Sequence, residues 1–203
     1  VIGPYSPDAG DAGRRSLRLA ALGYLTRTDA GQRAARLYQD ADNMTEQMGA
    51  WSCLLNAGKG QSEGAHFYDR WQDDPNTLNK WFALQVAHSA PADTVQIADQ
   101  LSQHAAFDLR DPNRFRSVFG ALATHHAGFH ASSGAAYRLL SDWLLRLDVL
   151  NPQTTARMCS AFQTWARYDT GRQDLMRTEL SRIADTPGLS RDTAEMVTRM
   201  LKA

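Results

Sequence analysis

Apolar residues recur along most of this chain at steps of three and four, the spacing that places side chains on one face of an α-helix. The stretch 44–55 is typical, since Met44, Met48, Trp51 and Leu55 fall on one stripe. No stretch shows the period-two alternation that is typical of a strand. The pattern predicts about eleven helices, within residues 13–25, 29–38, 43–57, 62–74, 76–86, 93–101, 111–122, 133–148, 151–168, 171–184 and 190–202.

Capping residues and prolines separate these predicted helices. Asn43, with Glu46 three residues later, has the spacing of a capping box, and Asn76 is predicted to cap the helix that follows it. Asp111-Pro112 and Asn151-Pro152 each place a capping residue directly before a proline that suits the first helical position. Residues 1–12 are rich in Pro and Gly, so we predict a non-helical lead-in followed by a single domain over 13–203.

Eleven helices joined by short connections are too many for the core of one four-helix bundle. We therefore predict an all-α fold in which antiparallel helix pairs stack into a curved α-superhelix, a solenoid of the HEAT or armadillo kind. Self-similarity at a fixed period is not visible in the sequence, so this prediction depends on helix number and connection length alone.

Composition narrows the classes of partner. The chain has 203 residues, 43% of them apolar, and 22 basic residues balance 22 acidic ones. This balance favours neither nucleic acid nor an anionic membrane as the main partner.

No apolar run approaches the ~20 residues that span a bilayer, and no signal peptide is visible. Cys53 and Cys159 both lie in apolar helical patterns, which favours two buried thiols in a reducing compartment. We therefore expect a cytoplasmic protein.

Histidine is the first candidate for chemistry, because His126 and His130 have the spacing that brings two imidazoles to one helical turn. Gly128 lies between them and no glutamate follows the first histidine, so a polar loop is the preferred interpretation.

The chain also lacks a Gly-x-Ser-x-Gly elbow and a Walker phosphate loop. The five tryptophans lie on faces expected to pack in a core. We therefore assign no catalytic residue and no metal ligand to this chain.

Two arginine-bearing helix starts are the most informative polar features. Arg114 and Arg116 follow Asp111-Pro112, while Gln153 and Arg157 lie one turn apart after Asn151-Pro152. A cation in the first turns of a helix meets partial positive charge, so a compensating group is expected. One interpretation is an ordinary ion pair between helices, with Asp108, Asp111 or Asp148 as the acid. The other is a concave face that offers guanidinium groups to a carboxylate ligand.

A set of short motifs occurs in a fixed order along the chain. The motifs are Tyr5-Ser6-Pro7-Asp8, Gly13-Arg14-Arg15-Ser16-Leu17, Ala41-Asp42-Asn43-Met44-Thr45, Asn79-Lys80-Trp81-Phe82, Asp111-Pro112-Asn113-Arg114-Phe115-Arg116-Ser117, Phe129-His130, Asn151-Pro152-Gln153 and Arg167-Tyr168-Asp169. Together, in this order, they resemble the C-terminal domain of bacterial aminopeptidase N, of the gluzincin zinc aminopeptidase family. Position 51 is expected to be aliphatic in that family, so Trp51 is a departure that affects the packing of its helix.

The resemblance implies a non-catalytic domain of a larger multidomain hydrolase, one that closes over a separate catalytic domain holding one zinc ion. That domain and peptide substrates are the expected partners, and no cofactor is expected in this chain. By similarity, Gln153, Arg157 and Arg116 match positions that line the path of the substrate. The zinc-binding and amine-binding motifs of the family are absent from these 203 residues.

Two further expectations accompany this interpretation. The alternative to an enzyme domain is a free-standing α-solenoid that binds a protein partner along its concave face. Separated from a catalytic domain, the chain could expose an apolar docking face and self-associate.

Overall fold

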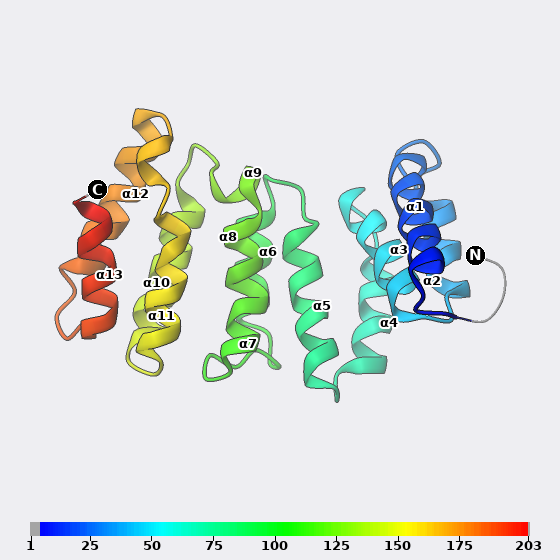
Figure 1. Ribbon diagram of the computed structural model, residues 1–203, viewed down its shortest axis with the longest axis horizontal. Coiled ribbons are helices and arrows are strands. Elements are labelled where there is room, and N and C mark those ends of the chain that lie inside the picture. The colour runs from blue at the N-terminus through cyan, green and yellow to red at the C-terminus, as the bar shows by residue number, and fades with distance from the viewer. Residues whose placement is uncertain (1–4, 203) are drawn as a thin grey trace. The chain divides into compact units, whose positions relative to one another are not determined.

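The predicted all-α class is confirmed. The computed structural model describes residues 5–202, and every regular element within this range is a helix (Figure 1). The sequence predicts a single domain over residues 13–203. The packing groups the chain into two compact units, residues 1–90 and 91–203. The first unit contains α1 (Ala9–Leu25), α2 (Gln32–Asp40), α3 (Met44–Asn56), α4 (Gln61–Trp71) and α5 (Pro75–Ala87).

The second unit is built from shorter and more varied helical segments. They are α6 (Thr94–Ser102), α7 (Pro112–Phe115), the π-helical turn η1 (Arg116–Gly120), α8 (Ala121–Thr124), α9 (His126–Phe129), α10 (Ala135–Asp148), α11 (Pro152–Met158), the 3₁₀ turns η2 (Cys159–Phe162) and η3 (Trp165–Arg167), α12 (Thr170–Ala184) and α13 (Arg191–Leu201).

Two predicted helix starts were wrong. The lead-in ends earlier than residue 12, because the Asp8 carboxylate accepts the Asp11 N–H at 3.0 Å and starts α1 at Ala9 despite two nearby glycines. Asn76 is not a cap, since Asp74 accepts the Thr77 N–H at 2.6 Å and Pro75 occupies the first helical position. A proline at that position makes the preceding residue the cap, which the prediction placed two residues too late.

Trp51 is the centre of the core of the first unit. Its ring is fully buried and stacks on Phe67 with ring centroids 5.3 Å apart. Its indole N–H donates to the carbonyl of Gly60 at 2.9 Å. A Cβ added to Gly60 or Gly64 would lie 3.0 or 3.1 Å from the Trp51 ring, so the large residue fits because both neighbours lack a side chain. The departure noted at position 51 is therefore accommodated by local packing.

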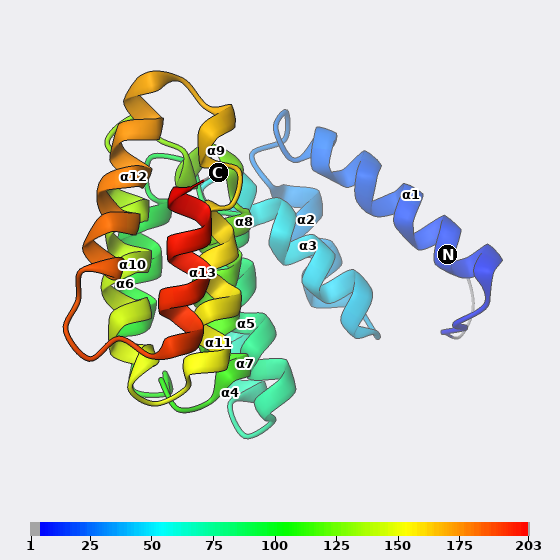
Figure 2. The ribbon, with the colours of Figure 1, turned by 60° about the vertical axis from the view of Figure 1, so that its left-hand side comes forward.

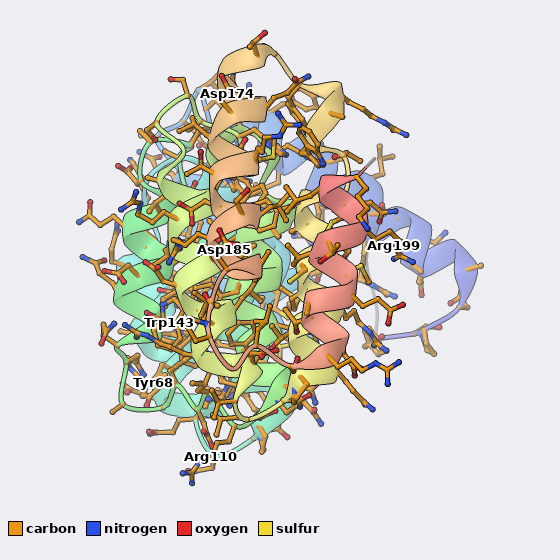
Figure 3. All side chains as sticks on the ribbon, turned by 90° about the vertical axis from the view of Figure 1, so that its left-hand side faces the viewer. Tyr68, Arg110, Trp143, Asp174, Asp185 and Arg199 are labelled. Carbon is orange, nitrogen blue, oxygen red and sulfur yellow. The ribbon has the colours of Figure 1, made fainter. Side chains whose placement is uncertain are left out.

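Helix α10 is the centre of the second unit. It packs against α6, α9, α11 and α12, and α13 packs on α11 and α12 (Figure 2). Figure 3 shows α12 and α13 side by side, with Asp174 and Asp185 marking α12 and Arg199 marking α13. The buried face of α10 consists of Ala136, Tyr137, Leu140, Ser141, Trp143, Leu144, Leu147 and Asp148.

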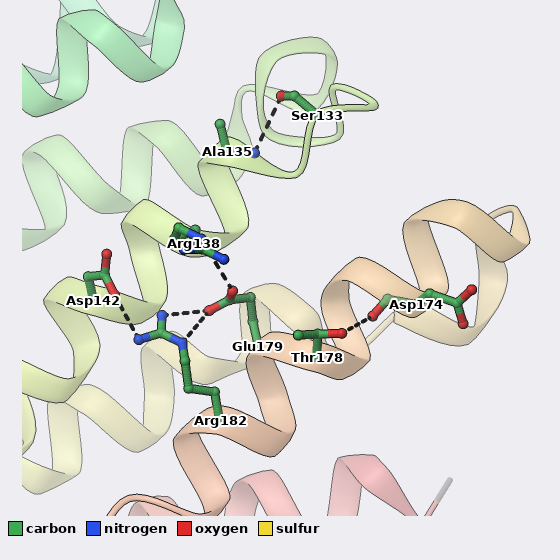
Figure 4. Close-up of polar contacts among 8 residues, drawn as sticks. All are labelled: Ser133, Ala135, Arg138, Asp142, Asp174, Thr178, Glu179 and Arg182. Carbon is green, nitrogen blue, oxygen red and sulfur yellow. Dashed lines mark hydrogen bonds and ion pairs between the residues drawn. The ribbon is translucent and has the colours of Figure 1, made fainter.

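Charged groups at the edge of this core join α10 to α12 (Figure 4). The Arg182 guanidinium on α12 contacts Asp142 on α10 at 2.8 Å and donates from Nε to Glu179 at 2.8 Å. Glu179, whose side chain is almost fully buried, also lies 3.9 Å from Arg138 of α10. These pairs fix the register of the two helices from outside the apolar core.

Across residues 5–202, none of the helices combines the length and the apolar character needed to cross a membrane.

The Trp51 packing gives a matched pair of glycine substitutions. Gly58 and Gly60 both have positive φ, at 69° and 91°, but only Gly60 faces Trp51, while a Cβ at Gly58 would meet open space. We expect Gly58→Ala to cost about 1 kcal/mol, from backbone strain alone. Gly60→Ala adds the displacement of the indole ring and should cost about 2–4 kcal/mol. Urea unfolding of the two variants measures both values, and equal losses would show that Trp51 does not depend on this close approach.

Candidate functional site

The sequence predicts one continuous helix from Asn151 to Tyr168, but the structure breaks this stretch into three segments. Asn151 caps α11 by accepting the Thr154 N–H at 3.0 Å, but the α-helix ends at Met158 and continues as two 3₁₀ turns. The buried residues explain this change, since Ala156, Cys159, Phe162 and Trp165 recur every third position, which is the period of a 3₁₀-helix. Met158, which was predicted on the core stripe, is only half-buried.

Gln153 and Arg157 are confirmed as an exposed polar stripe on α11. Both residues are exposed, four positions apart and therefore on the same side of the helix. Within residues 5–202, neither side chain makes a hydrogen bond or an ion pair. The amide and the guanidinium of this stripe are therefore open to solvent.

The electrostatic argument for a compensating ligand does not hold for Arg157. Because α11 ends at Met158, Arg157 lies in its last turn, where a cation is favourable beside the free carbonyl groups. Its exposure, not an electrostatic cost, is what makes it a candidate for binding.

Arg116 lies on a different element from Gln153 and Arg157. It begins the π-helical turn η1, is exposed, and donates from Nη2 to the Asn113 side-chain oxygen at 2.6 Å. No hydrogen bond or ion pair among the described residues joins Arg116 to the α11 pair. The structure thus places Gln153 and Arg157 on one side of α11, and Arg116 on a different element without a bond to either.

The three acids considered as ion-pair partners have other roles. Asp111 caps α7 through the Asn113 N–H at 2.8 Å, and Asp108 accepts the Arg110 N–H at 2.8 Å. In the part of the chain that is described, none of the three forms an ion pair with Arg116 or Arg157. The simple ion-pair interpretation of these two arginines was therefore wrong.

Asp148 links α10 to the start of α13. Its carboxylate accepts the Ser190 N–H and the Ser190 hydroxyl, each at 2.7 Å, and the Thr193 hydroxyl at 2.5 Å. Asp148 is 4% exposed, so three donors replace its hydration. Because α13 packs directly on α11, this carboxylate helps to hold the helix that carries Gln153 and Arg157.

His130 lies in a hydrogen-bonded contact with two tyrosines. His130 Nδ1 lies 2.8 Å from the Tyr137 hydroxyl, and its Nε2 lies 2.8 Å from the Tyr168 hydroxyl. Both ring nitrogens of His130 are therefore engaged by tyrosines. His126 lies parallel to it, with ring centroids 6.2 Å apart. Among residues 5–202, no three His, Cys, Asp or Glu side chains are grouped so that they could hold a metal ion.

The role of His130 was missed in the sequence because its partners are distant along the chain. The predicted loop at 125–130 is partly the short helix α9, and Tyr168 lies 38 residues after His130. No helical periodicity connects residues at that separation. The Arg172 Nε–H also donates to the His130 carbonyl, at 2.6 Å, so α12 takes part in the same contact.

Both cysteines are free thiols, as predicted. Burial, followed by the nearby Asp148 charge, raises the pKa of the Cys159 thiol to about 12. A thiol with this pKa is a poor nucleophile at neutral pH.

Comparison with known proteins identifies relatives along the whole chain. A family model described as "Domain of unknown function (DUF3458_C) ARM repeats" matches residues 2–202. Aminopeptidase N of Caulobacter vibrioides is 36% identical over 207 residues, covering 99% of this chain and 24% of the relative. Aminopeptidase N of Haemophilus influenzae is 35% identical, with coverage of 99% and 24%, and that of Escherichia coli is 32% identical, with coverage of 97% and 23%.

A solved structure shows the same relationship. The crystal structure of Legionella pneumophila aminopeptidase A in complex with aspartic acid superposes with a TM-score of 0.91 and 29% identity, covering 100% of this chain and 25% of that one. The chain therefore spans about a quarter of the length of the relatives it matches, and the matched quarter is their C-terminal helical domain. The predicted armadillo-like helical fold is confirmed.

The half-buried His130 predicts a pH dependence of stability. Burial, and then the positive charges of His126 and Arg172, lower the pKa of His130. The folded state therefore binds fewer protons than the unfolded state, so stability is lost as the pH falls below about 6.5, the unfolded value. We expect the free energy of unfolding to fall less between about pH 7.5 and pH 5.5 in His130→Gln than in the parent chain.

Urea unfolding at each pH measures this difference in slope. Gln39→Asn, an exposed substitution in the first unit that involves no titratable group, should keep the slope of the parent. An unchanged slope in His130→Gln would show that this ring does not titrate with folding.

Proposed function

The chain belongs to the DUF3458_C family of ARM-repeat domains, and on this premise we propose that it is the non-catalytic C-terminal domain of a zinc aminopeptidase. In this role it caps the active site of a separate catalytic domain and shapes the access of peptides during release of the N-terminal residue. The zinc ion belongs to that catalytic domain in this proposal. The similarity to aminopeptidases over the whole chain supports it.

The exposed pair Gln153 and Arg157 is the observation that carries the proposal. A side-chain amide and a guanidinium one turn apart, without partners in the described chain, suit the backbone and the carboxylate of a peptide. Gln153 would lie near the bound N-terminal residue and Arg157 toward the trailing part of the peptide. Arg116 is proposed for the same path, although its guanidinium contact with Asn113 makes it less available.

Two further proposals concern the partners and location of the chain. Leu17 and Tyr24 on α1 are 73% and 76% exposed, which supports self-association of the chain when it is separated from a catalytic domain. The two free thiols support a cytoplasmic location, where cysteines stay reduced.

The first test concerns the chain alone. Because the proposal places all chemistry in another domain, the purified 203-residue chain should bind no stoichiometric zinc and should release no amino acid from an alanyl chromogenic substrate. Metal analysis and a turnover assay measure this. Chelator-sensitive turnover by the pure chain would refute a non-catalytic role.

The second test uses a polypeptide that includes the catalytic domain. Removing one charge-assisted contact is worth ~1.5–3 kcal/mol, so Arg157→Ala should raise KM for tripeptides by about tenfold or more. A single-residue amide does not reach the trailing position, so its KM should change little. Steady-state kinetics on both substrates measure this split.

Arg191→Ala, at an exposed position on α13, serves as the matched control and should leave both KM values unchanged. An equal loss for the amide and the tripeptide in Arg157→Ala would argue against contact with the trailing part of the substrate.

A further inference from the structure

The first unit contains an open surface cavity, with polar and apolar walls, that the proposed function does not use. It has a volume of about 400 Å³ and lies between α2, α3 and α4, with His66 and Arg70 exposed at its edge. Its polar lining includes Tyr38 from α2, Gln47 from α3, and Glu63, His66 and Arg70 from α4. This volume falls within the range of small-molecule sites, ~300–1,000 Å³.

Gln47 forms part of the same wall. The residue is 7% exposed overall, and its side-chain amide makes no hydrogen bond to any described residue. The amide atoms are not fully buried, so they meet solvent at the cavity, where they can offer both a donor and an acceptor.

Tyr38 and His66 fix the hydrogen-bonding character of one wall. The Tyr38 hydroxyl donates to the Glu63 carbonyl at 2.9 Å, so its single proton is used there. The His66 Nδ1 also lies 2.9 Å from that hydroxyl, and in the tautomer in which Nδ1 donates to it, Nε2 is left as an acceptor.

Charges of both signs line the same cavity. Glu63 and Arg70 lie seven residues apart, which places them on one face of α4 two turns from each other. Within residues 5–202 no ion pair joins Glu63 to Arg70. Instead, the Glu63 carboxylate accepts the Ser62 hydroxyl at 2.9 Å, and the Arg70 guanidinium lies 5.2 Å from the Trp71 ring.

The Tyr38 hydroxyl reports the proximity of both charges. Burial is the main cause that raises the pKa of Tyr38 to about 12, the Glu63 charge raises it further, and the Arg70 charge opposes them. Both charges therefore lie near this hydroxyl, at the wall of the cavity.

We propose that this cavity binds a free α-amino acid. The α-carboxylate would pair with Arg70, for which a guanidinium fork is well suited, and the α-ammonium would pair with Glu63 and the His66 Nε2 acceptor. The Gln47 amide would complete the hydrogen bonds of either group. The residues of the cavity carry this proposal, and the proposed function adds only that the same polypeptide would release such amino acids.

The test is titration of the ¹⁵N-labelled 203-residue chain with L-alanine, followed by NMR at constant ionic strength. A ligand of so few atoms should bind in the millimolar range, with shifts confined to α2, α3 and α4. L-alaninamide lacks the carboxylate and N-acetyl-L-alanine lacks the ammonium group, so each should bind at least about tenfold more weakly.

Charge-neutral substitutions test the two contacts separately. Arg70→Gln and Glu63→Gln should each weaken L-alanine binding at least about tenfold. Asp69→Asn, exposed on the same helix outside the cavity lining, and Arg36→Gln, exposed on α2, are matched controls and should not change it. The spectrum of each variant without ligand shows that it remains folded.

Three results would overturn the proposal. The first is that chemical shifts in α2–α4 do not change with L-alanine well above the millimolar range. The second is that L-alanine and both blocked analogues bind equally. The third is that N-acetyl-L-alanine alone of the two analogues binds as tightly as L-alanine. The last result would identify a site for anions alone. None of these measurements depends on catalytic activity, so a failure here is distinct from a failure of the aminopeptidase proposal.

Discussion

The buried carboxylate of Asp148 is the contact on which the arrangement of the second unit depends. A charge that is 4% exposed is costly unless donors replace water, and here three donors come from the first turn of α13. The partial positive charge at that helix start adds to the compensation. Since α13 packs on α11, a single carboxylate on α10 fixes the layer that presents Gln153 and Arg157.

Local signals in the sequence predicted helices and most of their caps well. Asn43, Asp111 and Asn151 each accept an N–H in the first turn, as their positions before apolar stripes indicated. Errors arose where two signals overlapped. At Asp74-Pro75-Asn76 three residues favour a helix start, and only the geometry of proline decides that Asp74 is the cap.

The second half of the Asn151–Tyr168 stretch could not be assigned by helical spacing. Residues at 158, 162 and 165 fit an α-helix, and residues at 156, 159, 162 and 165 fit a 3₁₀-helix equally well. Tertiary contacts decide between them, because Trp165 donates its indole N–H to the carbonyl of Met200, 35 residues away. Local spacing also fails to predict the hydrogen bond between His130 and Tyr168, because these residues are far apart in the sequence.

The sequence alone says less about the candidate site than about the core. Arg182 and Arg172 have carboxylate partners on the surface of the second unit, at 2.8 and 2.6 Å, whereas Arg157 has none in the described chain. Its place in the last turn of α11 removes the electrostatic cost that had suggested a ligand, so an exposed arginine there is stable without one. What favours a binding role is the combination of Arg157 with an equally unpaired Gln153 and a chain that covers only a quarter of its aminopeptidase relatives. In the proposed role, Gln153 and Arg157 would form one side of a peptide site and a catalytic domain would form the other.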